Sequence, residues 1–182
     1  MGAIHKAHLT MIKKCNKSCA KSLVTIFINK HQFNKKSDYV RYPRVLKNDI
    51  NLLEKNRVDY LYLPTAKQIY PKGPSKKIKI SAFGKKLCGK YRPRHFEAIA
   101  DVIERFIKII NPKKIYLGQK DMQQLKILEH FVKKNHPYTK IISCKTVREK
   151  NGIAYSSRNN LLTVDQKIIA SKIFKLLIKE KK

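Results

Sequence analysis

Hydrophobic residues along the chain fall into two kinds of segment, short β-branched runs and longer stretches with helical spacing. Short runs of this kind are typical of strands buried in a parallel sheet, and the longer stretches are typical of helices with one apolar face. The predicted strands cover residues 22–28, 58–64, 76–83, 113–118 and 139–149, and the predicted helices cover residues 42–56, 96–110, 121–135 and a last segment from Thr163 into the terminal lysines.

Several of these boundaries rest on end signals. Pro43 suits a first helical turn, Asp121 suits a helix N-terminus, and Thr163 with Gln166 forms a capping box. The alternation in residues 76–83 favours an edge or half-exposed strand. Because strands and helices alternate, the predicted fold class is α/β with a mostly parallel sheet.

Ligands of such sheets bind outside the carboxyl ends of the strands. This rule selects residues 29–33, residues 118–121 and the segment near Ser156. His5 and His8 would lie at the same rim if a strand preceded them.

Composition narrows the class of protein. A chain of 182 residues can bury one core, or one and a fraction. No apolar run is long enough to span a bilayer, and the first residues show no signal peptide. The four cysteines form no CxxC pair, which indicates reduced thiols and a cytoplasmic protein. A zinc site made by His5 and His8 with Cys15 or Cys19 is disfavoured, because zinc sites prefer tighter, repeated ligand pairs.

The formal net charge of +30 suggests a nucleic-acid or anionic partner. Only eight of the 42 basic residues are arginine, the better side chain for phosphate and base recognition. The lysines are scattered as doublets and form no single stripe. We therefore favour a solvated lysine-rich surface, and nucleic-acid binding stays as the alternative.

Three loops at the predicted rim carry groups suited to anions. His5 and His8 would share one face at a helix N-terminus, where backbone N–H groups favour phosphate. Lys120 lies between a strand and a helix, and the third loop holds Ser156, Ser157 and Arg158. Each motif alone is compatible with an ordinary polar turn. Together, with no Walker A or GxGxxG motif, they indicate another scheme for holding a nucleotide.

Six ordered motifs resemble those of the pantoate–β-alanine ligase family. They read MGAIHKAH, FINKHQF, YPR, RPRHF, GQKDMQQL and YSSRNNLLT, against the family patterns MGxLHxGH, NPxQF, YPR, RPxHF, GEKDxQQL and SSRNxYL. Their order and approximate spacing hold from Met1 to about Thr163.

The resemblance implies a Rossmann-like nucleotidyltransferase fold and a two-step ligation. ATP and pantoate would form pantoyl-adenylate and pyrophosphate, and β-alanine would then displace AMP to give pantothenate. The substrates are small molecules, a homodimer is possible, and neither a membrane nor a nucleic acid is expected as partner.

The resemblance also assigns roles to residues. His5 and His8 would bind the ATP phosphates, with His8 as proton donor, and Lys120, Ser156, Ser157 and Arg158 would stabilise the transferring phosphate. Gln32 and Gln124 would hold pantoate, with Gln32 also near β-alanine, and Asp49 would lie near Mg²⁺. The full set implied to bind ATP is Met1, Gly2, His5, His8, Gly118, Gln119, Lys120, Asp121, Val147, Tyr155, Ser156, Ser157 and Arg158.

The sequence departs from the family patterns at five places, which hold Ala7, Lys30, Asn48, Gln119 and Tyr155. In the family, the MG pair ends the first strand, and a lid-like domain follows SSRN. We therefore expect residues 1–146 to form a nucleotidyltransferase core without its first strand. Residues 147–182 would begin a shortened C-terminal lid. A fragment, a mis-called start and a decayed copy that only binds ATP are the alternatives.

Overall fold

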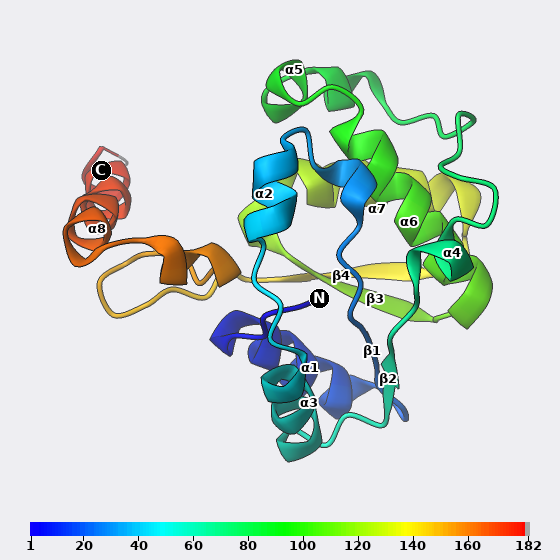
Figure 1. Cartoon of the computed structure of the whole chain (residues 1–182), viewed down its shortest axis with the longest axis horizontal. Helices are drawn as coiled ribbons and strands as arrows, with labels where there is room; N and C mark the ends of the chain where they lie inside the picture. Colours follow the sequence, from blue (N-terminus) through cyan, green and yellow to red (C-terminus); the bar gives the residue numbers. More distant parts are fainter. Residues whose placement is uncertain (181–182) are drawn as a thin grey trace.

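The computed structural model describes residues 1–180, which form helices packed around two small parallel sheets (Figure 1). The strands are β1 (Leu23–Thr25), β2 (Tyr60–Tyr62), β3 (Lys114–Gly118) and β4 (Lys140–Cys144). The α-helices are α1 (Lys6–Ser18), α2 (Lys36–Arg41), α3 (Leu46–Lys55), α4 (Ala66–Ile69), α5 (Cys88–Tyr91), α6 (His95–Ile110), α7 (Met122–Asn135) and α8 (Val164–Lys179). Short 3₁₀ turns are η1 (Lys30–Gln32), η2 (Ala82–Lys85), η3 (Gln119–Asp121) and η4 (Ser157–Leu161).

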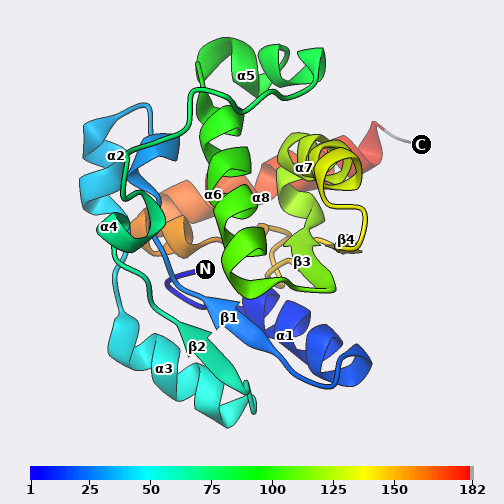
Figure 2. The ribbon, with the colours of Figure 1, turned by 90° about the vertical axis from the view of Figure 1, so that its right-hand side faces the viewer.

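Strand pairing confirms the predicted parallel arrangement. β1 pairs with β2, with Val24 opposite Leu61, and β3 pairs with β4, with Ile115 opposite Ile141. The sheets are layered between helices: α1 and α3 lie on one side, and α6 and α7 on the other (Figure 2). This is the α/β class that the alternation of elements predicts.

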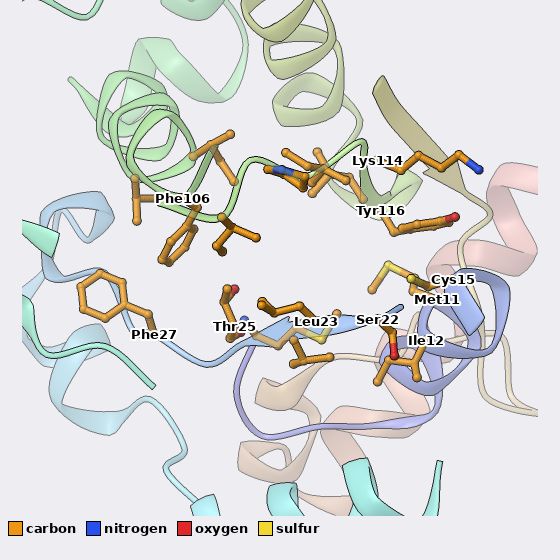
Figure 3. Close-up of a pocket in the computed structure, with 18 of the residues that line it drawn as sticks. Met11, Ile12, Cys15, Ser22, Leu23, Thr25, Phe27, Phe106, Lys114 and Tyr116 are labelled. Carbon is orange, nitrogen blue, oxygen red and sulfur yellow. Dashed lines mark hydrogen bonds between the residues drawn. The ribbon is translucent and has the colours of Figure 1, made fainter. Parts of the chain in front are cut away.

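The expected single sheet is instead two sheets of two strands, separated by a cavity of about 840 Å³. Figure 3 shows Leu23 from β1 facing this cavity opposite Tyr116 from β3, with Phe27 and Phe106 at its far end. Within residues 1–180 no strand joins the facing edges of β1 and β3. Apolar side chains of α1, β1, β3 and α6 form much of the cavity wall.

Three buried clusters hold the layers together, and the smallest, with Tyr70 and Val102, packs Tyr62 of β2 against α6. The largest joins α6 and α7 to β3 and β4 and includes Phe96, Ile99 and Leu128. The second lies between α1, β1 and α3 and includes Ile12 and Leu53. In α6 the apolar residues recur three and four positions apart, so one face of the helix is buried, as its amphipathic pattern predicts.

One predicted element is wrong, and one predicted helix starts later than expected. Residues 76–83 form no strand: Ile78 and Ile80 are half-buried against the α6–α7 cluster, but no strand in the described chain pairs with the segment. Alternation reports which side chains face a core, and a strand also needs a backbone partner. The helix predicted from residue 42 begins at Leu46, so Pro43 lies before it. The other predicted strands are present but shorter at their ends.

The last helix stands beside the main body (Figure 1). Its predicted capping box is confirmed: the Gln166 N–H donates to Thr163 Oγ1 at 3.2 Å, and the Thr163 N–H donates to Gln166 Oε1 at 3.0 Å. The terminal lysines at 181–182 lie outside the described residues. No helix in the described part of the chain is long and apolar enough to cross a bilayer.

Candidate active site

The two histidines of the first motif meet at the start of α1. His5 immediately precedes the helix, and His8 lies in its first turn. Their rings stack with centroids 3.9 Å apart, and the His5 backbone N–H donates to His8 Nδ1 at 3.3 Å. In neutral His8 the proton therefore sits on Nε2. His5 Nδ1 is buried and has no hydrogen-bond partner among the described residues.

Both imidazoles are neutral at pH 7. Burial is the main cause that lowers the pKa of His8, to about 3, and a proton on His5, the Met1 amino group and Lys120 lower it further. Burial and then the Lys120 charge also lower the pKa of His5. The pair can thus offer neutral donors and acceptors to a ligand, while Lys120 supplies the positive charge.

Asp49 supports the loop that leads into α1. Its Oδ2 accepts from the Ala3 N–H at 2.9 Å, and its Oδ1 accepts from the Ile4 N–H at 2.6 Å. Gly2 and Ala3 both have positive φ, +147° and +48°, so this loop needs an anchor. At the start of the loop, the Met1 amino group donates to the Thr25 carbonyl oxygen at 2.6 Å.

This geometry does not fit the predicted metal role of Asp49. The side chain is 1% exposed and both carboxylate oxygens already accept backbone N–H groups. No group of three or more His, Cys, Asp and Glu side chains that could hold a metal occurs within residues 1–180. Asp49 therefore anchors the loop before α1. It supports the histidines indirectly, through the backbone of Ala3 and Ile4.

The second loop begins where β3 ends. Gly118 is the last residue of β3, Gln119–Asp121 form η3, and α7 starts at Met122. Gln119 Nε2 donates to Ser143 Oγ at 2.8 Å, which ties this turn to β4. Lys120 is exposed, and its charge acts on both histidines. Asp121 occupies the predicted N-cap position, but its side chain caps no N–H group of the described chain.

The third segment, residues 147–158, lies beside the histidines although it is far from them in sequence. The Tyr155 N–H donates to the Val147 carbonyl oxygen at 3.0 Å, and the Tyr155 ring lies 6.0 Å from the His5 ring. Ser156 Oγ accepts from the Arg158 N–H at 3.3 Å. Tyr155 thus stands at the junction between the histidine pair and the serine–arginine turn.

Ser157 and Arg158 contact Tyr42, the first residue of the YPR motif, and Asp38, which lies in none of the motifs. Ser157 Oγ donates to Tyr42 Oη at 3.1 Å. Arg158 donates to both carboxylate oxygens of Asp38, from Nε at 3.1 Å and from Nη2 at 3.0 Å. Its guanidinium carbon lies 4.9 Å from the centre of the Tyr42 ring. A partnership between residues so distant in sequence leaves no local signal.

The predicted substrate glutamines line one cavity. Gln32 lies in η1, Gln124 lies in the first turn of α7, and both border the space between the two sheets. The Gln32 carbonyl oxygen lies 2.7 Å from Nδ1 of the buried His95, which fixes η1 against α6. Asn29 Nδ2 donates to the Ala98 carbonyl oxygen at 3.1 Å and strengthens the same junction. The structure therefore brings Lys120 and Tyr155 to the histidine pair, and it places the two glutamines on the wall of the cavity between the sheets.

Comparison with known proteins agrees with this arrangement. The family model described as pantoate–β-alanine ligase matches residues 1–182. The chain belongs to the pantoate–β-alanine ligase family. It is 37% identical over its whole length to the pantothenate synthetase of Sulfurihydrogenibium sp. and 40% identical over 167 residues to that of Endomicrobium trichonymphae. It spans less than two thirds of the length of these relatives, 65% and 59%.

Solved structures of this family share the fold. The pantothenate synthetase of Thermus thermophilus superposes with a TM-score of 0.93 at 31% identity, over 98% of this chain and 65% of that one. The pantoate–β-alanine ligase of Francisella tularensis, complexed with β,γ-ATP and β-alanine, superposes with a TM-score of 0.92 at 40% identity, over 97% of this chain and 68% of that one. The predicted family and nucleotidyltransferase fold are confirmed.

One departure from the family pattern has a clear structural outcome. Ala7 replaces the glycine of the HxGH-like motif and lies in the first turn of α1. Its φ is not positive, so the backbone does not require glycine at this position. The histidine pair of this ligase-family chain therefore forms on an ordinary helical turn.

Proposed function

We propose that this chain carries the adenylating site of a pantoate–β-alanine ligase. In the first step a pantoate carboxylate oxygen attacks the α-phosphorus of ATP, and the bond to the leaving pyrophosphate breaks. In the second step the amine of β-alanine attacks the acyl carbon of pantoyl-adenylate, loses a proton to solvent, and displaces AMP. The products are pantothenate, AMP and pyrophosphate.

The observation that carries this proposal is the set of groups around the histidine pair. Three features converge at the N-terminus of α1: a buried His5 Nδ1 without a partner in the described chain, a His8 with its proton on Nε2, and the Lys120 charge. Helix N-termini favour anions, and phosphoryl transfer needs positioning and charge stabilisation more than covalent help. These groups can meet the non-bridging phosphate oxygens as charge develops on them.

The first step also requires the two reactants to be held in line. Gln32 and Gln124 border the cavity beside this cluster and would hold the hydroxyl and carboxylate groups of pantoate. Ser156, Ser157 and Arg158 would contact the phosphates from the other side. The complex of the Francisella tularensis relative with β,γ-ATP and β-alanine supports ATP and β-alanine as substrates of the family core.

Magnesium does not fit a protein-ligated site among the described residues, because Asp49 is engaged by backbone N–H groups and no other ligand cluster is present. Mg²⁺ would enter on the phosphates of ATP, as it commonly does in phosphoryl transfer. The residues of this chain act on the substrates directly, and none of them is assigned as a metal ligand.

The proposed organisation keeps residues 1–146 as the nucleotidyltransferase core and residues 147–182 as the start of the lid domain. The strand β4 ends at Cys144, and α8 beyond it stands beside the core (Figure 1). A homodimer and a cytoplasmic location remain part of the proposal, the latter consistent with the four free cysteines of the described chain.

Pyrophosphate release from MgATP tests the proposal, measured with and without pantoate and before any β-alanine is added. We expect release only with pantoate, and a loss of at least about a hundredfold in the His8→Gln variant. The matched control is His130→Gln, because His130 is an exposed histidine on α7. ATP binding without pantoate-dependent release would instead identify a non-catalytic nucleotide-binding protein.

A further inference from the structure

The segment from α2 to Tyr42 clasps the serine–arginine turn across 120 residues of sequence. Two side chains make the clasp: Asp38 pairs with Arg158, and Tyr42 bonds to Ser157 while its ring lies under the Arg158 guanidinium. Asp38 lies outside the six motifs, and Tyr42 opens the YPR motif, to which the resemblance gave no role. Their contacts involve the two residues that the proposed function places on ATP phosphate.

The pairing leaves part of the Arg158 guanidinium free. Nε and Nη2 donate to Asp38 in a two-point contact, and Nη1 donates to no group within residues 1–180. A guanidinium has five N–H donors in a rigid plane, so a carboxylate that holds one edge also orients the other. Arg158 is therefore presented with one edge held and one edge available to an anion.

Charge around the pair makes this orientation depend on Asp38. Arg92 lies close enough for the charges of both Asp38 and Arg158 to act on it, Asp38 raising its pKa and Arg158 lowering it, although burial is the largest effect. Two guanidiniums side by side repel each other, and the Asp38 carboxylate offsets that repulsion. Without Asp38, Arg158, whose side chain is 45% exposed, would turn away into solvent.

We propose that Asp38 is a positioning residue that holds the Arg158 fork with its Nη1 edge free for a phosphate of ATP. The clasp would thereby link the loop that carries Gln32, through α2, to the nucleotide site. This inference rests on the proposed function, since it takes ATP as the anion that Arg158 meets.

The test measures binding of a non-hydrolysable ATP analogue with Mg²⁺ by calorimetry. In Asp38→Asn, whose amide cannot make the same charged two-point contact, we expect affinity to fall about tenfold. Asp38→Glu should restore affinity to within about threefold of wild type, because a second carboxylate can hold the fork. Asp165→Asn removes the same charge from an exposed position in the first turn of α8 and should leave affinity unchanged.

A double-mutant cycle separates positioning from a general charge effect. Lysine cannot form the planar two-point contact, so in an Arg158→Lys background Asp38→Asn should weaken binding by less than about twofold. Equal losses in both backgrounds would overturn the proposal. Unchanged or tighter binding in Asp38→Asn would also overturn it, since Asp38 would then restrain Arg158 rather than present it.

Failure of the proposed function gives a different pattern. A wild-type protein that binds the analogue but releases no pyrophosphate with pantoate refutes the ligase proposal and leaves the Asp38 comparison fully interpretable. A wild-type protein that does not bind the analogue refutes both. If the ligase proposal holds, Asp38→Asn should raise KM for ATP and leave KM for pantoate unchanged, a split that loss of folding would not produce.

Discussion

The His5 backbone N–H donates to His8 Nδ1 at 3.3 Å, and this contact decides which nitrogen of His8 holds its proton. With Nδ1 accepting, Nε2 is the donor of the neutral ring. Because burial lowers the pKa of His8 to about 3, the ring keeps this form throughout the neutral range. The helix start thus offers a fixed, uncharged donor next to the Lys120 charge.

Stability in acid should report this buried histidine. The folded-state pKa of His8 is about 3, below its ordinary value of 6.5, so the unfolded chain takes up the proton first as pH falls. The stabilisation is complete above pH 6.5 and is lost progressively between pH 6.5 and 3, at about 1.4 kcal/mol per pH unit. Urea unfolding at several pH values measures the slope.

Two histidine variants make that measurement specific. His8→Gln should lower the slope of the unfolding free energy against pH by about 1.4 kcal/mol per pH unit, the contribution of one proton. His130→Gln, at an exposed position on α7, should keep the wild-type slope. Identical slopes in wild type and His8→Gln would contradict the buried neutral state of His8.

Elements with strong periodicity and clear ends could be predicted from the sequence. The helix α6, the strand β3 and the capping box of Thr163 and Gln166 follow from local chemistry that tertiary contacts reinforce. Residues 76–83 misled the prediction, because their alternation reflects Ile78 and Ile80 packing on the core without a strand partner in the described chain. Pairing is a property of the whole fold, which one segment does not encode.

The site shows the same division. The order of the motifs predicts that His5, Lys120 and Arg158 lie at one rim, because each of them lies next to a regular element. In the structure the Lys120 charge acts on both histidines. The Asp38–Arg158 pair could not be predicted, because surface acids carry no mark of a partner 120 residues away. The burial of Asp49 and its two backbone donors could not be predicted from the sequence, because both depend on how the loop before α1 packs against α3.

Asp49→Asn should destabilise the protein by about 2–3 kcal/mol. The amide keeps one acceptor oxygen for the N–H groups of Ala3 and Ile4 and turns an NH₂ group toward the other. Urea unfolding at pH 7 measures the loss, and Asp165→Asn, an exposed change of the same charge, should shift stability by less than about 0.5 kcal/mol. A stable Asp49→Asn protein with a raised Mg²⁺ requirement would restore the metal role.

Lys120→Gln should raise the pKa of His5. The Lys120 charge is the second cause, after burial, that holds this pKa below its ordinary value. Removing the charge leaves the burial effect, opposed by a backbone hydrogen bond that raises the pKa. NMR titration of the His5 ring measures the change, and Lys126→Gln, a change of the same kind on the exposed side of α7, serves as control. A His5 pKa that stays the same in Lys120→Gln would mean that the two side chains are not neighbours in solution.

The adjacent residues Gln123 and Gln124 should respond differently to substitution, one through stability and the other through KM. Gln124 borders the cavity, and Gln124→Ala should raise KM for pantoate about tenfold while leaving stability within about 0.5 kcal/mol. Gln123 is buried and bonds to the backbone at three points: its Nε2 donates to the carbonyls of Phe83 and Lys86, and its Oε1 accepts from the Cys88 N–H. Gln123→Ala should therefore cost about 2–4 kcal/mol of stability.

The contrast between the two glutamines identifies the substrate side of α7. Pyrophosphate release at varied pantoate gives KM for each variant, and urea unfolding gives its stability. If Gln124→Ala loses stability and keeps its KM, Gln124 packs against the cavity wall without contacting pantoate. If Gln123→Ala raises KM for pantoate without loss of stability, the substrate lies on the η2 side of the helix, and the cavity between the sheets is not its binding site.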